Sequence, residues 1–369
     1  MDKIKHVVID ARPISSSGYG TYLRGLLENL GKIDTATRYT VLVWPDYDRK
    51  SLKLPANFSL QKANYPINGS LKEQFNLAWR LYRLKPDLVH FAITQQPLLY
   101  FGKSITTVHD LTALRFSNPS ENFLKFKFKQ LMFGFMLFWI GHKSKILITP
   151  SDYVRQDVAR FAKINPKKIL VTYEAATNYK DKPKKVAGLV GQKFVMYVGR
   201  PNPHKNLERL IEAMQIVQAS HPELKLVLAG KNDKNYEKIK KLTQENNLTS
   251  QVIFTDFVSD GQLVWLYKNA LGYVFPSLSE GFGLPGLEAM SYSLPVASSN
   301  ASCLPEIYKD AALYFNPEDT KGIASKIIQL ASSPGLRKDL IHKGLVLAKT
   351  YSWQKTAEQT LDIYKKVLG

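Results

Sequence analysis

The amino-acid sequence predicts an α/β protein of two domains, each built on a parallel sheet. Short β-branched runs alternate with helical patterns along the chain, which is typical of parallel sheets with helices on both faces. The length of 369 residues suits two domains better than one. The pattern also restarts after residues 181–192, which are rich in Lys, Pro and Gly and lack apolar periodicity. We therefore predict two Rossmann-like domains, residues 1–180 and 193–350, joined by a linker at 181–192.

The expected strands form two series, one on each side of the linker. The strands of the first series are Ile4–Asp10, Tyr39–Trp44, Phe58–Lys62, Asp87–Phe91, Ser104–Val108, Lys145–Thr149 and Ile169–Thr172. Those of the second are Phe194–Val198, Leu224–Ala229, Val252–Phe254, Gly272–Phe275, Pro295–Ser298 and Ala312–Phe315. Helical patterns between or after them include Thr21–Leu30, Asn206–Gln218, Gln262–Asn269, Lys321–Ala331 and the terminal segment 351–369.

Composition narrows the class of protein. With 44% hydrophobic and 11% aromatic residues, the chain can bury a core, which argues against disorder. The single cysteine, Cys303, excludes a disulfide framework and a thiolate metal cluster. Residues 1–10 contain Asp10 and no apolar run of signal-peptide length, so we expect no export and a reducing, cytoplasmic setting.

The charge of the chain is strongly basic and uneven. A net charge of +20 suggests nucleic acid, an anionic membrane surface, or acidic small molecules such as nucleotide phosphates as partners. Residues 1–180 hold 27 basic and 13 acidic residues, a net +14, whereas residues 181–369 hold 24 and 18, a net +6. The excess therefore belongs mainly to the first domain.

One segment of the first domain, Phe123–Ile140, is unusually apolar. Only 13 uncharged positions separate Lys129 from Lys143, fewer than the about 18–20 that a membrane span needs. Because Lys125 and Lys127 precede the large apolar side chains, the segment suits an interfacial helix. A helix packed on its own sheet or at an internal interface is the alternative, and both remain open.

Two weak motifs lie near the start of the chain. Gly18 and Gly20 follow the first strand, where glycine lets backbone N–H groups approach an anion at a helix N-terminus; an ordinary strand-to-helix turn is the alternative. The third glycine of a dinucleotide fingerprint is replaced by Leu23. Asp46 and Asp48 form an Asp-x-Asp pair suited to Mg²⁺ or Mn²⁺, but no His or further acid is near in sequence, which favours a solvated turn.

Three candidate residues follow strands, where ligands of open α/β sheets bind. His109 ends the strand 104–108 and can donate to a sugar hydroxyl or an oxyanion; a structural histidine is the alternative. Arg200 and Lys205 lie between the strand 194–198 and the next helix. Such a loop brings fixed cations and helix N–H donors to a pyrophosphate, although loop cations are often merely solvated.

The most informative segment is SEGFGLPGLEAM, residues 279–290. Glu280 stands before a Gly281-Phe-Gly283 turn, and Glu288 lies about one turn inside the helix that begins near Leu284. Both carboxylates can face a ligand along the helix N-terminus, where they suit sugar or ribose hydroxyls. A capping acid beside a solvated acid is the alternative. Paired acids also suit glycoside hydrolysis, but cations in the same domain favour a nucleotide-linked substrate.

In these motifs the sequence resembles glycosyltransferase family 4, the retaining group 1 enzymes of GT-B architecture. The resemblance is carried by GRPNPHKNLERLIEA, FVSDGQLVWLYKNA, PSLSEGFGLPGLEAM, LPVASSNASCLPEI and DAALYFNPED, spread over residues 193–320. GYGTYLRGLL and TVHDLTALRF extend it to the first domain. It implies two Rossmann-like domains facing across a deep cleft, with segment 351–369 crossing back to the first. The wording PHKNLERL is most similar to mannosyltransferase-like members.

The resemblance implies a role for each site residue. Arg200 and Lys205 would bind the donor diphosphate, Glu280 the hydroxyls of the transferred sugar and Glu288 the ribose, while His109 would reach the sugar across the cleft. Further donor-site positions would be Gly18, Gly20, Phe257, Val258, Phe282, Gly283 and Leu284. The nucleotide sugar is then a substrate, and neither a metal nor another cofactor is expected.

The resulting prediction is a retaining, metal-independent hexosyltransferase of cell-surface polysaccharide or glycolipid synthesis. It would move mannose from GDP-mannose to a glycan or lipid-linked acceptor, in the cytoplasm and peripherally on the inner face of the plasma membrane. Where the family often has Gly, this chain has Asp256, Ala175 and Ser293, which leaves a UDP-sugar as the alternative donor. A basic nucleic-acid- or membrane-binding protein without activity is the third reading. Against a nucleic-acid partner, the segment with aromatic residues beside lysines is too apolar for a base-stacking surface.

Overall fold

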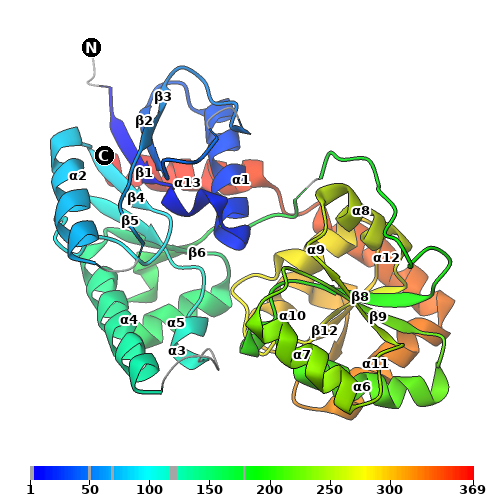
Figure 1. Cartoon of the computed structure of the whole chain (residues 1–369). Helices are drawn as coiled ribbons and strands as arrows, with labels where there is room; N and C mark the ends of the chain where they lie inside the picture. The colour runs from blue at the N-terminus through cyan, green and yellow to red at the C-terminus, as the bar shows by residue number, and fades with distance from the viewer. Residues whose placement is uncertain (1–3, 49–50, 68–69, 117–122, 178) are drawn as a thin grey trace. The chain divides into compact units, whose positions relative to one another are not determined.

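The computed structural model consists of two compact α/β units (Figure 1). It describes residues 4–48, 51–67, 70–116, 123–177 and 179–369. Unit 1 contains the described residues up to Arg115, those of 123–174, and Ser352–Gly369, and unit 2 is formed mainly by Ala175–Tyr351. Each unit has one sheet in which all paired strands are parallel. The predicted α/β class with two Rossmann-like domains is therefore confirmed.

The sheet of unit 1 has the strand order β3-β2-β1-β4-β5-β6-β7. Its strands are β1 (His6–Asp10), β2 (Arg38–Val43), β3 (Phe58–Lys62), β4 (Leu88–Phe91), β5 (Ser104–Thr107), β6 (Ile146–Thr149) and β7 (Ile169–Val171). The interior strand β1 is buried along its whole length and pairs with both β2 and β4. Its side chains alternate between two cores: Val7 and Ile9 join one, and Val8 joins the other.

The helices of unit 1 cover both faces of this sheet. They are η1 (Arg12–Ser15), α1 (Ser17–Ile33), the π-helix η3 (Glu73–Leu77), α2 (Ala78–Leu84), α3 (Thr112–Arg115), α4 (Phe123–Lys143), α5 (Asp152–Ala162), η4 (Pro166–Lys168) and α13 (Trp353–Leu368). The core that contains Val7 also contains Leu26 of α1 and Leu361 of α13, whereas the core around Val8 contains Leu77 and Leu81. The last helix of the chain thus completes the first unit.

The sheet of unit 2 has the strand order β10-β9-β8-β11-β12-β13. Its strands are β8 (Phe194–Val198), β9 (Lys225–Ala229), β10 (Val252–Asp256), β11 (Gly272–Phe275), β12 (Val296–Ser299) and β13 (Ala312–Phe315). Its helices are η5 (Pro203–Lys205), α6 (Leu207–Ser220), α7 (Lys234–Glu245), α8 (Asp260–Asn269), α9 (Leu284–Ser291), α10 (Leu304–Tyr308), η6 (Lys309–Ala311), α11 (Thr320–Ser332) and α12 (Pro334–Ala348). Among the described residues, every predicted strand is present, with ends that differ by at most two residues.

Two stretches differ in detail from expectation. The first helix begins at Ser17 instead of near Thr21, because the extended residue Ser16 already ends the preceding turn, so Gly18 and Gly20 lie inside the first turn of α1. Residues 181–192 contain neither helix nor strand, but Val186 and Leu189 are buried within unit 2. This stretch therefore packs on the second unit instead of hanging free between the two.

Candidate functional site

The strand order of unit 2 places two candidate residues side by side. β8 and β11 are neighbours in the sheet, and both leave it at the same edge because they are parallel. Lys205 follows β8 in η5, and Glu280 follows β11. Their Nζ and Oε1 atoms are 2.6 Å apart, and both side chains are partly exposed, by 19% and 12%. The ammonium also lies 5.7 Å from the centre of the Phe275 ring. A cation and a carboxylate are thus held together at this edge.

Asn206 fixes the two loops that carry this pair. Its φ of +59° is in the left-handed region, which asparagine tolerates better than most residues. Its buried amide donates to the carbonyls of Pro276 (3.0 Å) and Pro317 (2.7 Å). The N–H of Leu278 also donates to the carbonyl of His204 at 2.7 Å. The sequence prediction treated Asn206 only as a helix start; its place directly after Lys205 was the available signal.

The loop between Glu280 and α9 requires glycine. Gly283 has φ +97°, and a Cβ atom there would lie 2.5 Å from the hydroxyl oxygen of Tyr308. That hydroxyl donates to the Gly283 carbonyl. The N–H of Glu280 donates to Ser302 Oγ at 3.0 Å, which ties the loop to the segment after β12. Lys205, Glu280 and the start of α9 at Leu284 therefore share one rigid edge of the sheet.

Arg200 lies in the same loop as Lys205, and its side chain is exposed. Its carbonyl accepts from the N–H of Asn202 at 2.9 Å. Farther along the edge, Phe257 follows β10 and is 79% exposed, while Val258 is half-buried. Phe282 is instead buried, edge-to-face against Tyr351 with ring centres 5.6 Å apart.

Glu288 has very different surroundings from Glu280. It lies within α9, is buried, and accepts from the hydroxyls of Tyr267 (3.1 Å) and Tyr179 (3.3 Å). Burial raises the pKa of Glu288, although hydrogen bonds from Thr177 and the two tyrosines act in the opposite direction. The sequence missed these tyrosines, because they come from different segments of the chain.

Two departures from the family pattern adopt a glycine-like backbone. Asp256 has φ +53° and Ser293 φ +62°, both in the left-handed region that glycine enters without strain. Ala175 is not among the positive-φ residues of the described chain. The backbone shape at Asp256 and Ser293 is thus kept although the residue type is changed.

In unit 1, His109 is held from both sides. It follows β5, and its Nε2 donates to the carbonyl of Ala92 (3.0 Å), which follows the neighbouring strand β4. Its Nδ1 lies 3.1 Å from Glu174 Oε1. The ring centres of Tyr19 and Tyr22 lie 5.0 and 4.9 Å from the centre of the His109 ring. The sequence prediction missed Glu174, which follows β7 at the same sheet edge. His109 is thus held rigidly in a polar setting.

A second, fully buried histidine lies behind His109. His90 Nε2 is 2.8 Å from Thr107 Oγ1, and its Nδ1 is 2.7 Å from the hydroxyl of Tyr364 on α13. Thr107 is also hydrogen-bonded to Tyr22 at 3.0 Å. Burial, with a smaller contribution from the charge of His109, lowers the pKa of His90 to about 3. This neutral network joins the last helix to the centre of the sheet.

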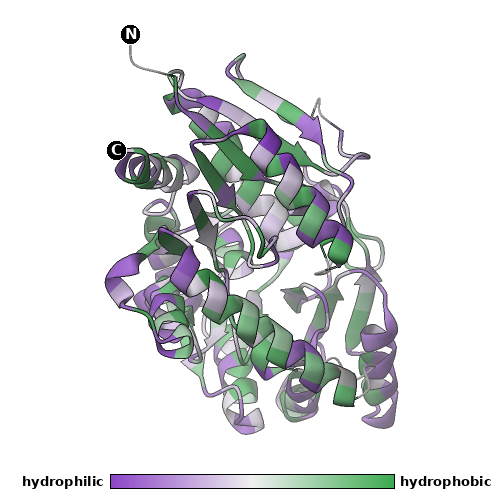
Figure 2. Ribbon diagram, turned by 90° about the vertical axis from the view of Figure 1, so that its left-hand side faces the viewer, coloured by the Kyte–Doolittle hydropathy of each residue, from purple (hydrophilic) through white to green (hydrophobic). Residues whose placement is uncertain are grey.

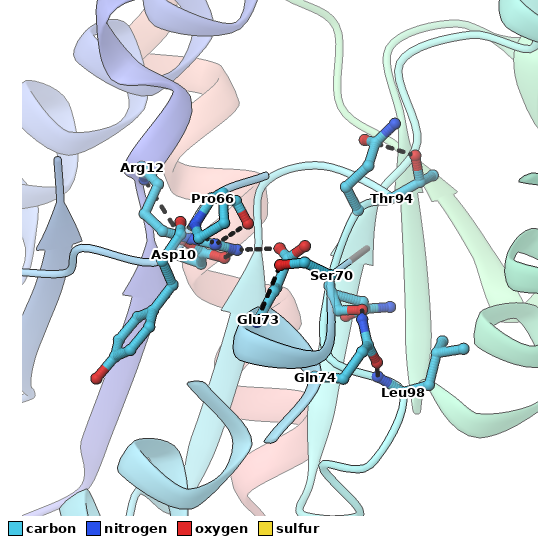
Figure 3. Close-up of polar contacts among 11 residues, drawn as sticks. Asp10, Arg12, Pro66, Ser70, Glu73, Gln74, Thr94 and Leu98 are labelled. Carbon is cyan, nitrogen blue, oxygen red and sulfur yellow. Dashed lines mark hydrogen bonds and ion pairs between the residues drawn. The ribbon is translucent and has the colours of Figure 1, made fainter. Parts of the chain in front are cut away.

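Arg12 lies at the carboxyl end of β1 between two carboxylates (Figure 3). It donates to both oxygens of Asp10 (2.8 and 2.7 Å), to Glu73 (2.9 Å), and to the carbonyl of Tyr65 (2.9 Å). All three charged side chains are almost fully buried. Burial disfavours the guanidinium charge, but the charges and hydrogen bonds of Asp10 and Glu73 outweigh it and raise the pKa of Arg12. The sequence prediction did not single out this triad.

Gly18 and Gly20 differ in what surrounds them. A Cβ atom on Gly20 would lie 2.3 Å from the Ile14 carbonyl, whereas one on Gly18 would meet nothing within 4 Å. Gly20 is therefore required for the packing of α1 on η1. Gly18 has room for a side chain and lies in the helical backbone of α1, so packing does not require glycine there.

Among the described residues, no cluster of three or more His, Cys, Asp or Glu side chains could hold a metal ion. Asp46 and Asp48 lie in the loop after β2, outside any such cluster.

Cys303 is buried, and its thiol donates to the carbonyl of Glu280 at 3.3 Å. Burial raises the pKa of this thiol well above its usual value.

Comparison with known proteins gives a family match. Residues 179–345 match the family described as glycosyl transferases group 1. The O-antigen chain mannosyltransferase B of Escherichia coli is 29% identical over 78% of this chain and 76% of its own length. The O-antigen chain mannosyltransferase RfbU of Salmonella typhimurium is 28% identical over 62% of this chain and 61% of its own. The serotype-specific mannosyltransferase WbdA of Escherichia coli is 33% identical, but over only 47% of this chain and 22% of its own length.

Solved structures share the fold over nearly the whole chain. The sucrose-phosphate synthase of Thermosynechococcus elongatus has a TM-score of 0.78 at 20% identity and covers 98% of this chain and 99% of its own. HepE of Anabaena in complex with UDP and glucose has a TM-score of 0.75 at 16% identity and covers 98% and 100%. The fold predicted from the sequence is thus confirmed, and the family match supports the resemblance over residues 179–345.

Proposed function

We propose that this group 1 glycosyltransferase transfers mannose from GDP-mannose to a glycan or lipid-linked acceptor. The observation that carries the proposal is the pair of Lys205 and Glu280 at one edge of the second sheet, 2.6 Å apart. The mannosyltransferase relatives support the choice of sugar. Synthesis of a cell-surface polysaccharide or glycolipid, in the cytoplasm or peripherally on the inner face of the plasma membrane, is part of the same proposal.

The chemistry proposed for this edge is stabilisation of a departing nucleotide diphosphate. When the bond to the sugar breaks, negative charge develops on the β-phosphate, and Lys205 and Arg200 supply fixed positive charge for it. In this proposal Lys205 exchanges its contact with Glu280 for the diphosphate, which frees the carboxylate to accept from sugar hydroxyls. The backbone N–H groups at Phe282, Gly283 and Leu284 lie at the start of α9, where a helix favours anions.

The remaining assignments follow the family resemblance. Glu288 binds the ribose, which requires that ribose hydroxyls replace those of Tyr179 or Tyr267 as donors. Phe257 and Val258 meet the base, and His109 contacts the transferred sugar from unit 1. Gly18 and Gly20 line the phosphate and acceptor side. The acceptor hydroxyl attacks the face that the diphosphate leaves and gives its proton to the departing phosphate, so the anomeric configuration is retained. Cationic side chains take the place of a metal ion.

A thermal-shift panel tests the donor. Ligands that bind the folded chain stabilise it by mass action, so GDP and GDP-mannose should raise Tm more than UDP, ADP or their sugars. A response to UDP-sugars alone would replace GDP-mannose with the alternative donor. A response to none of them would contradict the transferase assignment of the site. Transfer that proceeds fully in EDTA is expected, and strict Mn²⁺ dependence would contradict the metal-free mechanism.

A further inference from the structure

Helix α4 presents an exposed apolar stripe along one side. Leu124, Phe128, Leu131, Phe135 and Phe138 recur every three or four residues, so they share one helix face. Their exposed fractions lie between 45% and 76%. Figure 2 shows α4 lengthwise, with apolar residues along most of it. The opposite side of the helix, which includes Leu137 and Ile140, is buried in the core of unit 1. The helix is therefore apolar both toward its own unit and toward the outside.

A second exposed stripe lies on another helical segment of unit 1. Leu71 lies just before η3, and Phe75, Trp79 and Tyr82 follow along η3 and α2, again three or four residues apart. All four are 47–76% exposed. Tyr65, Phe75, Asn76 and Trp79 line a shallow hollow of about 570 Å³. Tyr65 also accepts, through its carbonyl, from the buried Arg12 of the triad in Figure 3.

The two stripes are joined by the loop after β4. The N–H of Phe101 donates to the hydroxyl of Tyr82 (2.8 Å), which in turn donates to the carbonyl of Leu99 (3.1 Å). Lys143, the last residue of α4, has its ammonium 5.6 Å from the centre of the Phe101 ring. We call the exposed apolar residues of the two stripes and of this loop together the apolar face. It consists of Leu71, Phe75, Trp79, Tyr82, Leu99, Phe101, Phe123, Leu124, Phe128, Leu131, Met132, Phe135, Phe138 and Trp139.

Exposed large apolar side chains are concentrated on the apolar face and are sparse elsewhere on the described chain. The described residues include 21 exposed large apolar side chains, and 14 of them lie on the apolar face. Soluble monomers rarely expose large contiguous apolar patches unless these bind something. We therefore expect the apolar face to bind a partner.

The charges around the apolar face are basic. α4 contains no Asp or Glu, whereas Lys127 and Lys129 lie among its exposed aromatic residues. Lys72 and Arg83 are exposed beside the second stripe, and Arg83 lies 4.7 Å above the Trp79 ring. The one acid of η3 and α2, Glu73, is buried against Arg12. Among the described residues of α4, η3 and α2, the face thus presents positive charge without an exposed carboxylate.

This charge distribution distinguishes between two occupants. A symmetric dimer through the apolar face would bring the same lysines of both copies together without a carboxylate to pair them. An anionic bilayer instead offers apolar chains for the aromatic residues and negative headgroups for the lysines. Tryptophans such as Trp79 and Trp139 also favour the membrane–water interface. No helix in the described part of the chain is both long and apolar enough to cross a membrane.

We propose that the apolar face docks unit 1 on the surface of an anionic lipid bilayer, with α4 lying in the interface. The proposal deepens the peripheral membrane location put forward in the proposed function by naming the surface responsible, and it requires no particular donor sugar. Docking would explain the excess positive charge of the first domain, which donor binding in unit 2 does not explain.

Vesicle sedimentation tests this docking. The full chain should sediment with vesicles of phosphatidylcholine and phosphatidylglycerol, and at least tenfold less with phosphatidylcholine alone. Phe128→Ser combined with Leu131→Ser should weaken binding to the anionic vesicles at least tenfold. The matched control is Ile216→Ser with Val346→Ser, which removes two exposed apolar side chains of unit 2 and should bind as the parent does. A separate variant, Lys127→Glu, should weaken binding severalfold at low salt.

Three results would overturn the proposal. They are no sedimentation of the parent, equal binding to neutral and anionic vesicles, and unchanged binding of the Phe128→Ser, Leu131→Ser variant. Light scattering provides a further check: a dimer that this variant dissociates, without vesicle binding by the parent, would assign the face to a second copy. The thermal shift with nucleotide sugars must remain as in the parent, so failure of docking is distinguished from failure of the donor site.

Discussion

Both units are built on a parallel sheet, but the ion pairs at their sheet edges differ in how far they are exposed. Unit 2 keeps the pair of Lys205 and Glu280 partly accessible at its sheet edge, on loops held by Asn206. Unit 1 closes its corresponding ion triad completely, with Arg12 between Asp10 and Glu73. An accessible pair can exchange partners with a ligand, whereas a closed triad can only hold its own loops together. Similar ion pairs at equivalent sheet edges therefore do not have similar functions.

The outer surfaces of the units differ as well. Most exposed large apolar residues of the described chain gather on the apolar face of unit 1, among lysines. The exposed ion pair of Lys238 and Glu208 illustrates the ordinary polar surface of unit 2. In the two proposals made above, unit 2 binds the donor and unit 1 contacts the membrane.

The largest effect on stability is expected when the closed triad is broken. Arg12→Met leaves two buried carboxylates without their cation, which should lower the free energy of unfolding by about 3–5 kcal/mol. Urea unfolding, with hydrogen exchange of β1 amides to locate the change, measures this. Arg83→Met, at an exposed site, is the control and should cost less than about 1 kcal/mol. A loss below about 1 kcal/mol for Arg12→Met would show that the triad is not structural.

Breaking the accessible pair should instead abolish activity and spare the fold. Lys205→Ala or Glu280→Ala should lower sugar transfer at least about 100-fold, because charge stabilisation of the leaving group is lost. The free energy of unfolding should change by no more than about 1 kcal/mol. Lys238→Ala removes an exposed ion pair of equal length, 2.6 Å, and should leave transfer unchanged. Normal turnover of either site variant would refute the site assignment.

The buried His90 should make unit 1 sensitive to acid. Its pKa is lowered to about 3 in the folded state against an ordinary 6.5, so the folded state disfavours the proton. Its contribution to stability is present above about pH 6.5 and is lost as pH falls toward 3, by up to about 1.4 kcal/mol per pH unit. His90→Gln should flatten this dependence in denaturant titrations between pH 6.5 and 4. An unchanged slope would mean that His90 is not kept neutral.

Glu288 should act in the opposite direction and with a smaller effect. Its pKa is raised, so its contribution is present below its ordinary pKa of 4.5 and is lost as pH rises through the folded-state value. The Glu288→Gln variant should therefore have a higher free energy of unfolding than the parent, and the difference should grow as pH rises from 4.5 toward neutrality. Thermal scans across that range measure the difference. The same variant should bind nucleotide more weakly, and equal binding would contradict the ribose assignment.

The sequence predicted the fold better than the side-chain contacts of the candidate site. Strands such as Phe58–Lys62 and Gly272–Phe275 were predicted to the residue, because apolar runs bounded by turn residues depend on local sequence. Glu174, Tyr267 and Tyr179 were missed, since they meet His109 and Glu288 only through the packing of distant segments. Long-range pairing leaves no periodic pattern to detect.

Segment 123–140 illustrates the same division. Its helix was predicted, and α4 extends from Phe123 to Lys143. Whether it was an interfacial helix, or packed on its own sheet or at an internal interface, remained open from sequence, because apolar residues occur all around it. The structure shows Leu137 and Ile140 buried in the core of unit 1 and Leu131 exposed, so the helix packs on its own unit, and contact with a membrane stays a proposal.

Helix α13 also affects the order in which the chain can fold as it is synthesised. Ala357, Leu361 and Tyr364 belong to the same core as β1 and α1, and Trp353 lies directly against Gly25. These core residues are translated after unit 2, although the rest of unit 1 is translated before it. Unit 2 can complete its own core as soon as Tyr351 has left the ribosome. Unit 1 therefore begins its synthesis before unit 2 but can complete its core only after unit 2 has been made.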